Sequence, residues 1–159
     1  MSCDVALAAF LWLASTGPAA AAPKPAVAVA VAAPQSVAKE PLFADIVGRA
    51  GRLKAEVEAW RGHLKADGPA ASLTGFDAFS ARIGELAALD QKGHEVLKAR
   101  GTDGDLKCIL HGISQDLPLK LGEIGKAATG KDQDAALRDM AYLLNDNVEV
   151  ITAPPAPAV

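Results

Sequence analysis

Residues 76–97 read FDAFSARIGELAALDQKGHEVL, and the spacing of the apolar side chains in this stretch decides the fold class. Apolar residues recur three or four positions apart, which places them on one face of an α-helix. Thr74 and Asp77 form a box-like pair that predicts where the helix begins. The stretch is therefore expected to be an amphipathic helix whose buried stripe consists of Phe76, Phe79, Ile83, Leu86, Ala87 and Leu97.

The same spacing returns in three further segments, whose apolar stripes lie within residues 42–64, 106–124 and 137–151. Asp103 and Asp132 are the expected N-caps of the third and fourth helices. Helices of about 20 to 27 residues joined by short loops run antiparallel to their neighbours. The sequence therefore predicts an all-α fold, an up-down-up-down antiparallel four-helix bundle over residues 42–152.

Pro118 falls inside the third predicted helix. A proline there removes one backbone hydrogen bond and clashes with the carbonyl of Ser114, which predicts a kink. Alternatively, Asp116 caps a restarted helix with Pro118 in its first turn. The third helix is therefore expected to be kinked or broken near Pro118.

The N-terminal segment has the order of a secretory signal peptide. Ten apolar residues, 5–14, are followed by a Ser-Thr-Gly-Pro breaker and then by alanines, so cleavage is expected after Ala21. Residues 1–4 contain no Lys or Arg, which a signal peptide usually has. The alternative is an uncleaved anchor, because apolar character over 5–22 approaches the ~20 residues that a bilayer needs. We expect residues 1–21 to direct the protein to the periplasm or outside the cell, or else to anchor it in the membrane.

Two further segments have a composition that does not build a core. Residues 22–41 are rich in Ala, Val and Pro and predict a disordered linker, and residues 153–159 predict a Pro-rich tail.

The net charge and the cysteine content indicate which classes of binding partner to expect. The net charge is −3, and no basic stripe interleaved with aromatic residues occurs, so no nucleic-acid partner is expected. Cys3 would leave with the signal peptide, and Cys108 would then be the only thiol of the mature chain. A lone thiol excludes an intramolecular disulfide, so we expect a protein partner or self-association, for example through Cys108.

Asp90 interrupts the apolar stripe of residues 76–97. A buried carboxylate must be paired or neutralised. Matching levels along an antiparallel bundle brings Arg49 opposite Asp90, with Asn147 and His94 as further neighbours. We therefore predict a buried polar layer of Arg49, Asp90, His94 and Asn147, which either fixes the helix register or lines a small ligand or metal pocket.

Cys108 and His111 lie three residues apart on the third predicted helix and could share a metal ion. A zinc site would need two more ligands from elsewhere. A helical wheel places Cys108 opposite the apolar stripe and His111 on its flank, so both are expected to be exposed.

Sequence motifs for catalysis are absent. The chain contains no Cys-x-x-Cys-His, no Gly-rich phosphate loop, no His-Glu-x-x-His and no Gly-x-Ser-x-Gly. No catalytic residue and no cofactor is predicted. We expect an exported, non-enzymatic helical bundle that serves as a binding or interaction module of the cell envelope; the alternative is a metal- or small-ligand-binding bundle, including one with a redox role.

Overall fold

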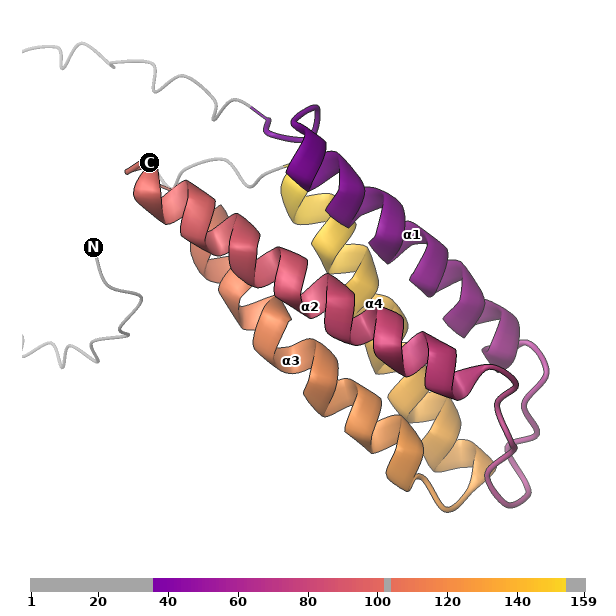
Figure 1. The fold of residues 1–159 in the computed structure, drawn as a ribbon. Coiled ribbons are helices and arrows are strands. Elements are labelled where there is room, and N and C mark those ends of the chain that lie inside the picture. Colours follow the sequence, from indigo (N-terminus) through magenta and orange to yellow (C-terminus); the bar gives the residue numbers. More distant parts are fainter. Residues whose placement is uncertain (1–35, 102–103, 154–159) are drawn as a thin grey trace, which may run out of the picture. The chain divides into compact units, whose positions relative to one another are not determined.

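The computed structural model describes residues 36–101 and 104–153. It contains four helices that lie side by side (Figure 1): α1 (Pro41–Arg61), α2 (Phe76–Ala99), α3 (Leu106–Lys126) and α4 (Gly130–Thr152). Successive helices run antiparallel, so the predicted all-α four-helix bundle is confirmed. The predicted signal segment, residues 22–35 of the linker and most of the tail lie outside the described residues.

The four helices pack as two close pairs, α2 with α3 and α1 with α4. The seam between α1 and α2 is packed less closely, and long charged side chains reach across it. The ion pairs across this seam are Glu40–Arg100 at 2.7 Å, Arg49–Glu85 at 2.8 Å and Glu56–Arg82 at 2.7 Å. From Glu40 to Glu56 the positions on α1 advance while their partners on α2 go back from Arg100 to Arg82. This order is that of two antiparallel helices.

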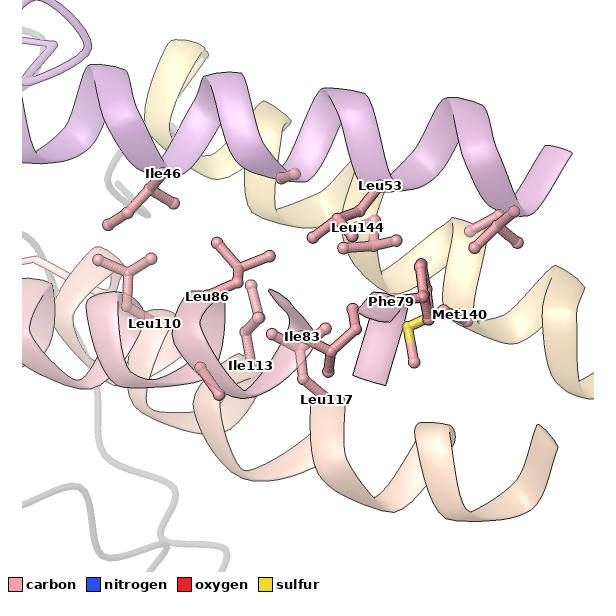
Figure 2. Close-up of a cluster of buried hydrophobic side chains, with 14 of the residues drawn as sticks. Ile46, Leu53, Phe79, Ile83, Leu86, Leu110, Ile113, Leu117, Met140 and Leu144 are labelled. Carbon is pink, nitrogen blue, oxygen red and sulfur yellow. The ribbon is translucent and has the colours of Figure 1, made fainter. Parts of the chain in front are cut away.

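Apolar side chains from all four helices fill the interior. Figure 2 shows them pointing toward one another between the ribbons. Their burial supplies the main favourable free energy of a fold of this kind. The labelled members are each at most 4% exposed: Ile46, Leu53, Phe79, Ile83, Leu86, Leu110, Ile113, Leu117, Met140 and Leu144.

The starts of α2 and α4 differ from the predictions. The N-cap of α2 is Gly75, whose φ of 80° is a left-handed conformation that favours glycine, and no side chain caps this helix. The cap of α4 is Thr129, not Asp132: its hydroxyl accepts from the N–H of Asp132 at 3.1 Å and donates to the Asp132 carboxylate at 2.7 Å. Asp132 is thus the third residue of the helix, whose N–H the cap accepts, and not the cap itself. The predicted cap Asp103 lies outside the described residues.

Helix α3 continues through Pro118 without a break. Of the two alternatives that the sequence left open, the restarted helix capped by Asp116 is therefore wrong. Pro118 is exposed, so its ring stands on the solvent side of α3 and leaves the packed face intact.

Two loops are tied together at one end of the bundle. Pro69 and Thr129 form an isolated antiparallel bridge, and Gly130 N–H donates to the carbonyl of Gly68 at 2.8 Å. The start of α1 and the end of α4 lie at the opposite end (Figure 1). There the Ser36 hydroxyl donates to the carbonyl of Ile151 at 3.3 Å. No helix within the described ranges is long and apolar enough to span a bilayer.

Candidate functional site

A polar pair lies in the middle of the apolar interior. Asp90 of α2 and Asn147 of α4 are both 0% exposed, and Asn147 Nδ2 donates to Asp90 Oδ2 at 2.8 Å. Helices α2 and α4 occupy opposite corners of the bundle and do not pack on each other. The hydrogen bond therefore crosses the core and joins two helices that otherwise lie apart.

The carboxyl group of Asp90 is strongly perturbed by its surroundings. Burial raises the pKa of Asp90 from 3.8 to about 7, and the hydrogen bond donated by Asn147 acts in the opposite direction. The other polar atom of each side chain, the carboxyl oxygen Oδ1 of Asp90 and the amide oxygen Oδ1 of Asn147, has no hydrogen-bond partner within the described part of the chain. The site therefore stabilises the neutral form of the carboxyl group.

The predicted contact between Arg49 and Asp90 is not made. Arg49 lies on the surface, where its guanidinium binds Asp45 at 3.0 Å and Glu85 at 2.8 Å. Both ion pairs keep the guanidinium in contact with water, which avoids the cost of bringing a second ionised group into the core. The interior polar residues of the predicted layer are thus Asp90, His94 and Asn147.

His94 faces α3 and not the polar pair. It is 9% exposed, and its Nδ1–H donates to the carbonyl of Lys107 at 2.6 Å. Its ring lies against that of His111, with ring centroids 4.8 Å apart and planes tilted by 31°. The His111 Nδ1–H donates to Gln91 Oε1 at 2.9 Å. The two histidines therefore form a stacked pair, here called the histidine pair, at the seam between α2 and α3.

The predicted exposure of Cys108 and His111 is wrong, since both residues are half-buried. The close packing of α2 on α3 covers this flank, and the His94 ring covers His111. Cys108 takes part in a disulfide bond and is not a free thiol. Across residues 36–101 and 104–153, no three His, Cys, Asp or Glu side chains are grouped so that they could hold a metal ion.

A groove opens at the end of the bundle where the two loops are tied, and we call it the loop-end groove. Its volume is about 470 Å³, which is in the range of small-ligand and peptide sites. Apolar side chains of Leu73, Phe76 and Ile124 line it beside the loop backbone of residues 70–73. The remaining lining residues are Gly75, Asp77, Gly125, Ala127 and Gln133.

Gln133 holds the loop backbone of the groove in place. This side chain is 4% exposed, and it accepts from the N–H of Ala71 at 2.8 Å and donates to the carbonyl of Ala71 at 2.9 Å. Ala70 N–H donates to the carbonyl of Ala128 at 3.1 Å. The next residue, Ser72, has no hydrogen-bond partner for its backbone N–H or C=O among the described residues. The groove thus offers the unpaired backbone N–H and C=O of Ser72 beside an apolar floor.

Sequence reasoning missed the loop-end groove. Residues 66–72 contain Gly, Pro and Ser and indicate only a turn. The one available signal was Gln133, a polar residue on the same helix face as Gly130, Ala136 and Leu137. No match to this chain was found among protein-family models, curated proteins or solved structures.

Proposed function

We propose that this protein is an exported, non-catalytic binding module that holds an extended peptide segment of a partner protein in the loop-end groove. The observation that carries the proposal is the backbone of Ser72, which lies unpaired beside the apolar side chains of Leu73, Phe76 and Ile124. An extended peptide recognises such a surface by pairing with the free backbone groups while one side chain fills the apolar pocket.

The rigidity of the groove supports this proposal. Gln133 and the bridge between Pro69 and Thr129 fix the backbone of the groove before any ligand arrives. A binding edge that is ordered in advance loses less conformational entropy when the ligand binds. Export to the periplasm or outside the cell rests on the signal-like order of residues 1–21. Mass spectrometry of the mature N-terminus tests it, because cleavage is expected after Ala21.

The groove is tested by crosslinking followed by binding measurements. A photoreactive residue is introduced at Ser72 in the exporting cell, with a second variant at the exposed Glu95 as a control for general surface contact. The proposal expects a crosslinked protein at Ser72 that is absent at Glu95. Crosslinks of equal yield at both positions would count against the groove.

Binding of the crosslinked segment is then measured with purified protein and a matched pair of variants. Ser72→Ala keeps the backbone N–H, whereas Ser72→Pro removes it. We expect Ser72→Ala to bind like the wild type and Ser72→Pro to bind about five- to tenfold more weakly, the effect of one hydrogen bond. Equal affinities would contradict pairing at Ser72.

A second candidate function, metal binding, is favoured by the histidine pair. His94 and His111 each donate Nδ1–H to a carbonyl oxygen, the arrangement that orients Nε2 toward metal ions in known sites. The ring planes are tilted by 31°, and Gln115 Nε2 donates to His111 Nε2 at 3.1 Å, so this bond would have to break and a ring would have to rotate for both Nε2 atoms to reach one ion. Titration with Cu²⁺ or Zn²⁺ tests this function: binding that is lost in His94→Gln and in His111→Gln supports it, and binding that survives both variants excludes the pair.

A further inference from the structure

Asp90 and Asn147, here called the acid–amide pair, have one hydrogen-bond donor too few when Asp90 is ionised. Asn147 Nδ2 donates to Asp90 Oδ2, while the two Oδ1 atoms of these same side chains have no partner in the described part of the chain. Both unpaired atoms are acceptors if Asp90 is ionised, so neither can satisfy the other. A single proton on Asp90 Oδ1 would supply the missing donor.

Among the described residues, no cation stands close enough to neutralise Asp90 instead. On α1, Arg49 is held at the surface by Asp45 and Glu85, and the Asp45 carboxylate carries negative charge. On α3, His111 is engaged with Gln91, and the residues that pack inward are Leu110 and Ile113.

The charged and titratable groups of α2 and α4 near Asp90 do not neutralise it either. His94, one turn along α2, donates to the carbonyl of Lys107 and faces α3. Asp146, next to Asn147 on α4, could only add negative charge. Burial and the bond from Asn147 account for the pKa of Asp90, and no charged group contributes.

We infer that Asp90 is a neutral carboxylic acid in the folded protein, and that its Oδ1–H donates to Oδ1 of Asn147. The two side chains then exchange two hydrogen bonds, one in each direction, and every polar atom of the pair is satisfied. With this proton the acid–amide pair joins α2 to α4 by two hydrogen bonds; without it only the bond from Asn147 Nδ2 remains, and both Oδ1 atoms are buried acceptors without a donor. The pair is therefore a proton-binding site that makes the packing of the bundle depend on pH.

The sign of the pH effect follows from the direction of the pKa shift. The folded state holds a proton on Asp90 up to a pH of about 7, whereas the ordinary value for the unfolded chain is 3.8. The unfolded state binds fewer protons in this window, so stability is full below it and falls as the pH rises through it. The equilibrium constant for unfolding should increase by up to about tenfold per pH unit within the window and level off above it.

The direct test is a pH titration of the full chain with ¹³C-labelled aspartate carboxyl groups. We expect one carboxyl signal with a midpoint near pH 7 in the wild type and its absence in Asp90→Asn. If every aspartate carboxyl group of the wild type titrates below about pH 5, as unperturbed groups do, the inference is overturned.

Urea unfolding at pH 5 and pH 8 provides the second readout. Asp90→Asn keeps the size of the side chain and places an amide donor where the acid proton stood, at every pH. Its unfolding constant should change far less between the two pH values than that of the wild type. Asp116→Asn, which alters an exposed carboxyl group on α3, should retain the wild-type dependence. Equal pH dependence in the wild type and Asp90→Asn would overturn the inference.

Discussion

Gly130 is buried at the first position of α4, where the two tied loops meet. A Cβ atom added there would overlap the carbonyl oxygen of Lys65 and would lie 3.1 Å from the carbonyl carbon. The neighbour is backbone and cannot rotate away as a side chain could. The close approach of the two loops at this end of the bundle therefore depends on one residue without a side chain.

Replacing Gly130 with Ala should lower the free energy of unfolding by about 1 to 3 kcal/mol, the usual cost of forcing extra volume into a packed site. Gly84→Ala is the matched control, because Gly84 lies exposed in α2 with nothing near its added Cβ. That variant should gain up to about 1 kcal/mol from helix propensity. Urea denaturation followed by circular dichroism measures both, and equal stability of the two variants would show that the loops move apart easily.

Asp90 shows what could and could not be predicted about a single residue from the sequence. Its position in the apolar stripe was sufficient to predict that Asp90 lies inside and that Asn147 is near. It could not identify the partner, because Arg49 has acids on both α1 and α2 within reach and its long side chain can turn to the surface. A helical wheel gives the direction of a Cβ atom and not the end of a flexible side chain.

At the scale of helices, the periodic apolar pattern was sufficient to predict the four helices, whereas the cap-forming residues did not predict correctly where α2 and α4 begin. Thr129 and Asp132 both have cap-forming side chains, and only the three-dimensional structure shows which of them is the N-cap. The start of α2 depends on the backbone conformation of Gly75, which no side-chain pattern specifies. The loop-end groove depends on contacts between residues 68–71 and 128–133, which are far apart in the sequence.

Pro118 is the residue of α3 whose effect on the stability of the helix can be estimated most directly. It is exposed inside a continuous helix, so it costs α3 one hydrogen bond to the carbonyl of Ser114 and serves no packing role in the core. Pro118→Ala should therefore raise the free energy of unfolding by about 1 to 3 kcal/mol.

Thermal and urea unfolding measure this gain against Leu119→Ala, a control at the neighbouring position, which is 64% exposed. That control should change stability by no more than about 0.5 kcal/mol. A loss of stability in Pro118→Ala would mean that the proline imposes a bend on which the packing of α3 depends.

At the scale of the whole molecule, residues 36–153 hold every buried side chain of the four-helix core. The short segment before α1 belongs to this unit, because Val37 and Ala38 pack on the core and Val37 accepts a backbone hydrogen bond from Glu40 at 2.9 Å. Residues just before the predicted boundary at residue 42 thus contact the bundle, and the boundary itself stays a prediction.

Two fragments test this boundary. Under reducing conditions, residues 36–153 should unfold at the same urea concentration as the full chain. Residues 41–153 should lose about 1 to 2 kcal/mol, because the apolar contacts of Val37 and Ala38 are gone. Equal stability of the two fragments would place the boundary at α1, and a less stable 36–153 fragment would show that residues 1–35 contribute to the fold.

The arrangement of the chain ends has a mechanical consequence. Helices α1 and α4 are packed side by side. The start of α1 and the end of α4 lie at the same end of the bundle, opposite the tied loops (Figure 1). Tension applied between the two ends would pull these helices apart one turn at a time, beginning at Ser36 and Ile151, and would not load all their contacts at once. The bundle should therefore open at low force when stretched through its termini, while the end that carries the groove separates last.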